Sequence, residues 1–297
     1  MRDNRAPQAR RMALSGFLEE KKDLLWAGLW LFGISCTAAW LELFLNAPAR
    51  ARVEAAFANT LLGALLVVFA ALLLGWGIAL ALVTLERRHQ RTPYLALTFA
   101  LNILRSVPQM VGMLVGYALI TALILRDALP STLAQIMMTS LITALFVFQE
   151  VVDLIRERVK HYEQLEFVNA LLVCGIPPLV IINREILLKN SMSHLIQKSV
   201  ALFGRAIFLI CSIDFIISVG LSTDVSLSNL PATLGSMLAS LDSKQDILVI
   251  GSVLSEPGMF GSLFFEHLQG VSVAFLIVFT LFCVHRISTG LTDRYRL

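Results

Sequence analysis

The 297-residue sequence contains few charged residues. Aspartate, glutamate, lysine and arginine make up only 15% of the chain, whereas an ordinary soluble domain carries about 25%. Hydrophobic residues account for 57% of the chain, and the mean hydropathy is +0.76. This shortage of charge argues against a soluble globular enzyme.

Cysteine and histidine are also scarce. The four cysteines, Cys36, Cys174, Cys211 and Cys283, are too scattered for a disulfide framework or a metal site. All but Cys174 lie in apolar stretches, and we interpret the four as packing residues. The five histidines occur singly and lack the spacing of metal ligands, so we expect no metal site. The net charge of +3 gives no support for nucleic-acid binding.

Long apolar stretches dominate the remainder of the sequence. A helix needs about 20 residues to cross about 30 Å of hydrocarbon. By this criterion the predicted spans are Leu24–Leu45, Asn59–Leu85, Pro93–Leu125, Ser131–Val152, Leu195–Gly220 and Leu268–Ser288. The third stretch is too long for one straight crossing, and Pro108 predicts a kink or break within it. The sequence therefore predicts an all-α polytopic membrane protein with about six transmembrane helices.

Lysine and arginine gather on one side of the predicted spans. Seventeen of them lie in the N-terminal segment, in the loops 86–92 and 153–194, and at the C-terminal end, whereas four lie in the loops of the other side. The positive-inside rule then assigns both termini and the loop 153–194 to the cytoplasm. The basic N-terminal segment has no apolar core of its own, so we expect an uncleaved anchor and not a signal peptide.

These spans and charges divide the chain into three parts. We expect a cytoplasmic N-terminal segment (1–23), a first transmembrane helix with an outer loop (24–58), and a core domain (59–297). Within the core domain, the outer segment 221–267 is long enough to form a small extracytoplasmic cap.

The loop 153–194 carries the most specific pattern. Leu165, Val168 and Leu172 form an apolar stripe at helical spacing. Gly175 can end that helix in the left-handed conformation, and Pro177 with the proline after it suits the first turn of a new helix. The loop is therefore predicted to be a short helix, a glycine elbow and a second helix. Such an element fits a groove on a soluble partner; the alternative is an interfacial helix on the lipid headgroups.

This loop resembles the cytoplasmic coupling loop of the permease subunits of binding-protein-dependent ABC importers. The family pattern is Glu-Ala-Ala, a glycine, and then Ile-Leu-Pro. Here it falls on Asn169-Ala170-Leu171, Gly175 and Ile186-Leu187-Leu188. Ala170 and Gly175 match, whereas Asn169 stands in place of the acid, which implies that one charged contact to the ATPase is absent. The resemblance assigns coupling to Glu166, Asn169, Ala170, Gly175, Pro177, Ile186 and Leu187.

Further stretches extend the resemblance over residues 59–294. Leu101–Pro108 resembles the opening of the broken third helix, and Asn59–Gly63 resembles the start of the helical core. Ala206–Gly220 with Asn229–Leu248 resembles the fifth core helix and its short outer helix, and Gly290–Arg294 resembles the usual chain ending. The chain is most similar to the dipeptide, oligopeptide and nickel branch. The phosphonate and methionine permeases share the Leu-Arg-Ser-x-Pro turn and remain alternatives.

The resemblance implies a type I ABC importer permease fold in a bacterial inner membrane. The expected partners are a second permease, two cytoplasmic ATP-binding subunits and an extracytoplasmic solute-binding protein. The solute would be a peptide or a similar small polar molecule. The chain would not itself be an enzyme or bind a cofactor, because ATP and Mg would be used by the partner subunits. In agreement, the sequence contains no Gly-x-x-x-x-Gly-Lys-Ser/Thr loop.

Polar residues inside predicted spans are candidates for function, because they are costly in lipid. Arg105 and Gln109 bracket Pro108 in the third span, and Asp214 lies in the middle of the fifth. We predict that Arg105, Pro108, Gln109 and Asp214 border the solute path or its gate. The alternative is that these residues form hydrogen bonds between helices or face the second permease.

Two basic residues lie in the cytoplasmic half of the fifth span. We expect Lys198 to extend to the lipid headgroups. Arg205 needs a partner inside the membrane, and Glu150 at the end of the fourth span is the candidate.

Two other functions remain open from the sequence. An ion-coupled secondary transporter would show internal repeats, paired broken helices and carboxylates at the bilayer midplane. The sequence indicates one broken span, no clear repeat and only Asp214 at such a depth. A permease-like scaffold without transport activity is the other alternative, supported by the degenerate coupling loop.

Overall fold

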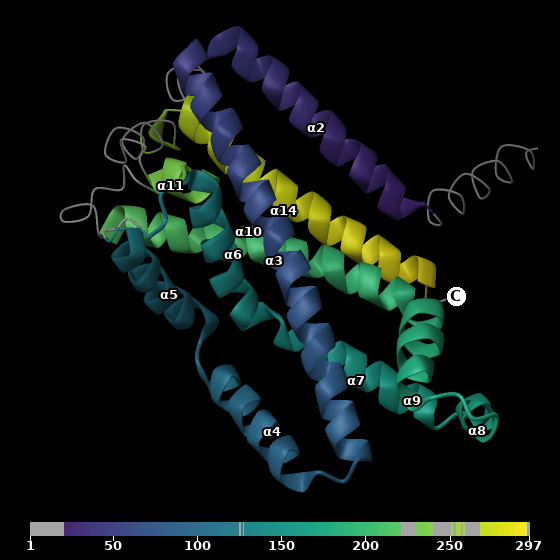
Figure 1. Ribbon diagram of the computed structural model, residues 1–297. Coiled ribbons are helices and arrows are strands. Elements are labelled where there is room, and N and C mark those ends of the chain that lie inside the picture. Colours follow the sequence, from purple (N-terminus) through teal and green to yellow (C-terminus); the bar gives the residue numbers. More distant parts are fainter. Residues whose placement is uncertain are drawn as a thin grey trace, which may run out of the picture.

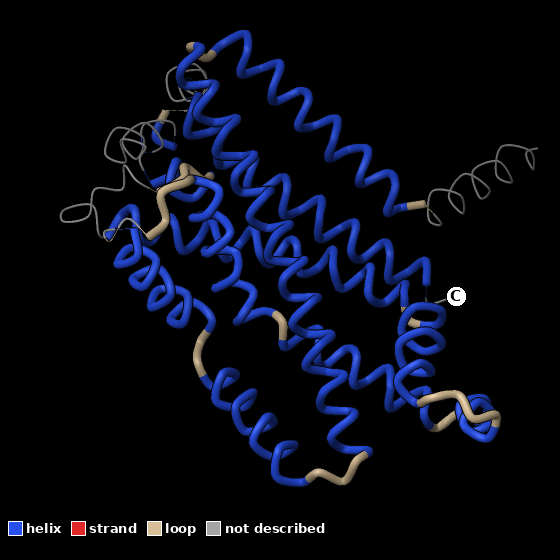
Figure 2. The backbone as a smooth tube through the Cα atoms, in the orientation of Figure 1, coloured by secondary structure: helices blue, strands red, loops and turns tan. Residues whose placement is uncertain are grey.

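The computed structural model describes residues 21–124, 126, 128–220, 230–239, 251, 254–256, 258 and 268–295. Within these ranges every regular element is a helix and no strand is present (Figures 1 and 2). The all-α prediction is therefore confirmed for this part of the chain. The N-terminal residues 1–20 and most of the predicted outer segment 221–267 lie outside the described residues.

Four helices are individually long and apolar enough to cross a membrane: α2 (Lys22–Phe44), α3 (Ala47–Arg87), α10 (Met192–Gly220) and α14 (Leu268–Tyr295). Two bent pairs pass the same test: α4 (Arg91–Ser106) with α5 (Gln109–Ile124), and α6 (Thr132–Val147) with α7 (Gln149–Glu163). If each pair is one crossing, the described residues hold up to six spans. The described part of the chain is therefore all-helical, and it holds four to six helices that are long and apolar enough for a polytopic membrane protein.

Helix α3 forms the centre of the bundle. It packs against α6, α7 and α10, and it runs through the length of the molecule (Figure 1). Its buried face consists largely of small residues at helical spacing, including Ala56, Thr60, Ala64, Ala71 and Ala79. Small side chains let helix backbones approach closely, and this contact replaces the hydrophobic effect as the driving force for helix association in lipid.

Helix α3 begins earlier than the predicted span. It starts at Ala47 instead of Asn59, so the residues expected to form an outer loop are helical. The segment is rich in alanine, which favours helix, and Pro48 occupies the first turn, where its missing N–H is not needed. Arg50 pairs with Glu54 one turn later at 3.3 Å. The charged residues that had indicated an outer loop therefore lie on the surface of a helix.

The break predicted at Pro108 is present. Helices α4 and α5 meet there at 93°, and Val107 adopts an extended conformation (φ −80°, ψ 121°). This conformation is expected because the ring of a following proline disfavours helix at the preceding residue. The third predicted span is therefore two helices.

A second bend, between α6 and α7, was not predicted. It turns the chain by 45° at Phe148, and α7 then continues to Glu163, well beyond the expected end at Val152. Neither proline nor glycine occurs at this position, so the local signals for a break are missing. The bend instead packs against α3, where a Cβ atom built on Gly75 would lie 3.0 Å from the Phe148 carbonyl oxygen.

Helix α2 lies at the edge of the bundle and packs antiparallel on α14 (Figure 1). The Trp30 indole donates a hydrogen bond to Thr280 at 3.3 Å, and Arg294 pairs with Asp23 at 3.0 Å. Most other α2 side chains are exposed. This helix is therefore attached to the rest of the described chain mainly through α14.

The cysteines divide into two groups. Cys211 and Cys283 are buried, as expected of packing residues, whereas Cys36 and Cys174 are exposed. The prediction of a packing role is therefore wrong for the latter two. Cys36 lies on the exposed surface of α2, which has few neighbours, and Cys174 lies in a connection outside the bundle.

Candidate functional site

The predicted helix, glycine elbow and second helix are present in the loop 153–194. Helix α8 (Glu166–Val173) ends at Cys174, and the chain then turns through Gly175 into α9 (Pro178–Val180) and the π-helix η1 (Ile181–Asn190). We refer to residues 166–190 as the α8–η1 segment.

Gly175 has a φ of +78°, a conformation that glycine adopts without strain. Its N–H bonds the Leu172 carbonyl at 3.0 Å, and the Ile176 N–H bonds the Leu171 carbonyl at 3.2 Å. This pair of hydrogen bonds is the Schellman arrangement that satisfies the last carbonyl groups of a helix. The elbow is therefore specified by local sequence.

Helix α8 lies at one end of the bundle (Figure 1), and several of its apolar residues are exposed. Val168 is buried against α7, but Leu165 and Leu172 of the predicted stripe are 39% and 38% exposed. Val173 is 89% exposed. Part of the apolar surface of α8, above all at Val173, is thus left uncovered by the described chain.

The residues assigned to coupling separate into two groups. Glu166, Asn169, Ala170, Gly175 and Pro177 are exposed on α8 and the elbow. In contrast, Ile186 and Leu187 of η1 are completely buried.

Helix η1 is anchored in the bundle. It packs against α7 and α10, and the Trp76 indole of α3 donates a hydrogen bond to the Asn183 side chain at 2.9 Å. The α8–η1 segment therefore has one exposed end and one end fixed among the membrane helices.

The two helix bends are joined by polar side chains. Arg105 at the end of α4 pairs with Asp153 and donates a hydrogen bond to Gln149 at 3.2 Å, both on α7. Gln109 at the start of α5 donates to the Phe146 carbonyl of α6 at 3.1 Å. These contacts bring Arg105, Pro108 and Gln109 to the α6–α7 bend, and none of the three lines the cavity described next.

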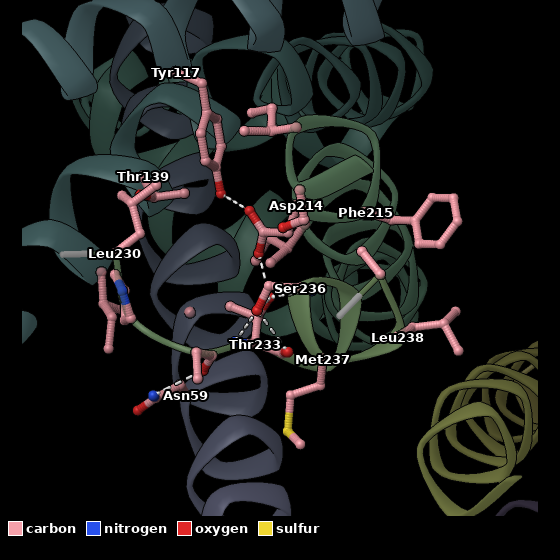
Figure 3. Close-up of a pocket in the computed structure, with 18 of the residues that line it drawn as sticks. Asn59, Tyr117, Thr139, Asp214, Phe215, Leu230, Thr233, Ser236, Met237 and Leu238 are labelled. Atoms are coloured by element: carbon pink, nitrogen blue, oxygen red, sulfur yellow. Dashed lines mark hydrogen bonds between the residues drawn. The ribbon is translucent and has the colours of Figure 1, made fainter. Parts of the chain in front are cut away.

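A cavity of about 720 Å³ lies between α3, α5, α6, α10 and α11 (Leu234–Ala239). Asp214 of α10 faces it and is only 7% exposed. The hydroxyl groups of Tyr117 and Thr233 each donate a hydrogen bond to a different oxygen of this carboxylate, as Figure 3 shows. We call this space the Asp214 cavity.

Helix α11 closes one side of the Asp214 cavity. The Asn59 amide donates to the Ala232 carbonyl at 2.9 Å, and the Thr60 hydroxyl accepts a hydrogen bond from the Leu234 N–H at 3.0 Å. A Cβ atom on Gly235 would collide with the Cys211 carbonyl of α10. The chain after Pro231 is thus held in place by α3 and α10.

Sequence reasoning identified Asp214 but missed its partners. Tyr117 was hidden in an apolar stretch, and Thr233 lies in a part of the chain read only as a short outer helix. The one available signal was the presence of a phenol inside a predicted span, because a buried tyrosine hydroxyl needs a hydrogen-bond partner.

Glu150 forms an ion cluster with two basic residues of α10. The predicted pair with Arg205 is confirmed. Lys198 also pairs with Glu150, at 2.6 Å, so the prediction that it extends to the headgroups is wrong. The Glu150 carboxylate keeps both cations at the α7–α10 contact.

Among the described residues, no group of three or more histidine, cysteine, aspartate or glutamate side chains is arranged to hold a metal ion. No protein-family model matches the chain, and no curated protein sequence matches it. The assignment of function therefore depends on the residues and their geometry.

Proposed function

We propose that this chain is a transmembrane permease subunit of an ATP-driven ABC importer. In this proposal it forms the solute pathway with a second permease subunit, and α8 receives movement from cytoplasmic ATP-binding subunits. The observation that carries the proposal is α8 itself, a short helix at one end of the bundle with exposed apolar residues, among them Leu172 and Val173. An apolar helix held in this way fits a groove on a soluble partner.

The connections of α8 support a role in transmitting force. Helix α7 leads into α8 from the α6–α7 bend, and η1 leads away from it into the buried core. Because Arg105 links α7 to the end of α4, a displacement of α8 would reach both bends. Such a path suits a transporter that alternates between two arrangements of its helices.

The distribution of charge supports an orientation in which α8 lies on the cytoplasmic side of the membrane. One end of the bundle holds the start of α2, the end of α14, α8 and the α3–α4 connection (Figure 1). The loops and termini of that side carry seventeen lysines and arginines, against four on the other side. The positive-inside rule assigns this end to the cytoplasm, and the membrane in this proposal is a bacterial inner membrane.

The proposed complex contains two permeases, two ATP-binding subunits and an extracytoplasmic solute-binding protein. ATP hydrolysis belongs to the partner subunits, and the solute is a peptide or a similar small polar molecule. With Asn169 in place of the family's acid, the apolar surface of α8 supplies most of the proposed contact to the ATPase.

Crosslinking tests the proposal directly. In a cysteine-free background, a single cysteine in place of Asn169 should crosslink to a co-purifying ATP-binding subunit, because this exposed position faces away from the bundle. The matched control is Asn46→Cys, which is exposed at the α2–α3 connection near the opposite end. Recovery of the chain alone, or equal crosslinking from both positions, would contradict the proposal.

Ion-coupled transport is the second candidate, favoured by the buried carboxylate in the Asp214 cavity. However, the two bent pairs follow one another directly in the chain and do not recur in two separate halves, as inverted repeats would require. Uptake into vesicles that requires an ion gradient and no ATP would favour this candidate. Unchanged transport after deletion of α8 would instead favour a function independent of the ATPase.

A further inference from the structure

The Asp214 cavity contains one buried negative charge. Asp214 is more than nine-tenths buried, and in the described part of the chain no lysine or arginine forms an ion pair with it. Its two hydrogen-bond partners, Tyr117 and Thr233, contribute hydroxyl groups, which carry no compensating charge. An ionised carboxylate away from water is unfavourable unless it is paired with a cation.

The carboxylate is nevertheless held in a fixed position. Figure 3 shows Tyr117 and Thr233 approaching Asp214 from two sides, each on one oxygen. A carboxylate has about four lone-pair sites, so two hydroxyl donors leave acceptor capacity for a ligand. Asp214 is thus oriented and has room for one further donor on its cavity side.

The size of the cavity suits an organic molecule. Its volume of about 720 Å³ falls within the range of about 300–1,000 Å³ that is typical of small-molecule sites. The lining combines apolar side chains, such as Ile136 and Phe215, with the hydroxyl groups of Thr139 and Ser236. A bare metal ion would not need a space of this size.

A positive charge lies elsewhere in the lining of the cavity, on α3. Among the described lining residues, Arg52 is the other charged one, and its side chain is exposed. Arg52 precedes Asn59 on α3 by two helical turns, or about 10 Å along the helix axis. Asn59 itself contacts the chain that leads to Thr233. The cavity therefore presents a buried carboxylate in its interior and a guanidinium group toward its exposed side.

We propose that the Asp214 cavity is a binding site, within this single subunit, for a small zwitterionic solute such as a short peptide. The ammonium group of the solute pairs with Asp214, and its carboxylate faces Arg52. Identification of this ligand with the transported solute rests on the function proposed above, whereas binding itself does not.

Charge-selective labelling tests the site in the full-length chain. Ser218 lines the cavity one helical turn after Asp214, so a cysteine in its place, in a cysteine-free background, reports on the same wall. For Ser218→Cys we compare the modification rates by a trimethylammonium and by a sulfonate methanethiosulfonate. We expect the ratio of these two rates to exceed the ratio for a free thiol in solution by at least about tenfold. Asp214→Asn should bring this ratio close to the free-thiol value, whereas Glu54→Gln, outside the cavity lining on α3, should leave it unchanged.

Protection by defined peptides gives a second readout that needs no change at Asp214. Dialanine and tetra-alanine should slow the modification of Ser218→Cys, and their N-acetylated forms, which lack the ammonium group, should not. The proposal would be overturned by equal protection by acetylated and free peptides, by no protection from any of them, or by a ratio of reagent rates no larger than that of a free thiol. If protection is found but Asn169→Cys crosslinks to no ATP-binding subunit, the site stands and the importer function fails.

Discussion

Gly75 and Gly77 lie two residues apart on α3 but have different surroundings. A Cβ atom on Gly75 would lie 2.8 Å from a Val151 methyl carbon and 3.0 Å from the Phe148 carbonyl oxygen. A Cβ atom on Gly77 would have no neighbour within 4 Å. The two positions therefore form a matched pair for testing the contact between α3 and the α6–α7 bend.

Gly75→Ala should lower the free energy of unfolding by about 1–3 kcal/mol, because the added methyl group has no space. Gly77→Ala should be neutral or stabilising by up to about 1 kcal/mol, because alanine favours helix. The measurement is thermal unfolding of each purified variant in detergent, followed by tryptophan fluorescence. Equal effects of the two changes would show that α3 and the bend do not pack as described.

Glu150 is a second residue with a specific role, since it neutralises both Lys198 and Arg205. Loss of one partner from a fully buried ion pair costs about 3–5 kcal/mol. Arg205 is half-exposed, so we expect Glu150→Gln to lower stability by a smaller amount, about 1–3 kcal/mol.

The control for Glu150 is Glu185→Gln in η1. Glu185 pairs with Lys189 four residues later at 2.8 Å, and such a pair contributes about 0.5 kcal/mol or less. Thermal unfolding at low and high salt compares the two variants. A loss at Glu150 no larger than that at Glu185 would argue against an ion cluster between α7 and α10.

At the scale of elements, the α8–η1 segment joins an exposed helix to a buried one through a single turn. Gly175 makes that turn possible with its positive φ. This left-handed conformation costs a residue with a side chain about 1–2 kcal/mol, although asparagine tolerates it better than most residues. The direction in which α8 leaves the bundle therefore depends on this one position.

In the proposed importer, Gly175→Val should reduce solute-stimulated ATP hydrolysis, because the change misdirects α8 while leaving its apolar surface intact. Gly175→Asn should retain most of the activity. Both variants are compared with the parent complex at equal ATP-binding subunit content. Full activity of the valine variant would mean that the elbow does not orient α8.

At the scale of the whole molecule, the structure separates two ends that differ in charge and in shape. One end carries α8, and the other carries the α2–α3 connection and α11 (Figure 1). The bends and their polar links lie between them, so any communication between the Asp214 cavity and α8 must pass through the middle of the bundle.

Labelling in oriented membranes tests this arrangement. A membrane-impermeant maleimide should react with the native, exposed Cys174 only in inside-out vesicles, because Cys174 lies beside Gly175 at the α8 end. A cysteine at Asn46 in a cysteine-free background should react only in right-side-out vesicles. The reverse labelling pattern would show that the protein has the opposite orientation in the membrane.

Local chemistry allowed several features to be predicted from sequence. The spans follow from apolar length, because only a helix satisfies its own backbone hydrogen bonds in lipid. The break at Pro108 and the elbow at Gly175 follow from the restricted backbone of one residue and the freedom of the other. The pair between Glu150 and Arg205 could be predicted because each needed a charged partner inside the membrane.

Other features depend on how the helices rotate and pack, which a single sequence does not specify. The bend at Phe148 has no proline or glycine and packs at Gly75 of α3, a residue distant in sequence. The meeting of Asp214 with Tyr117 and Thr233 requires α5, α10 and the chain before α11 to converge. Sequence alone therefore determined which segments are long and apolar enough to enter the membrane, and it placed the turns at Pro108 and Gly175. Tertiary packing decided which polar groups share a cavity, because such contacts join residues that no local pattern connects.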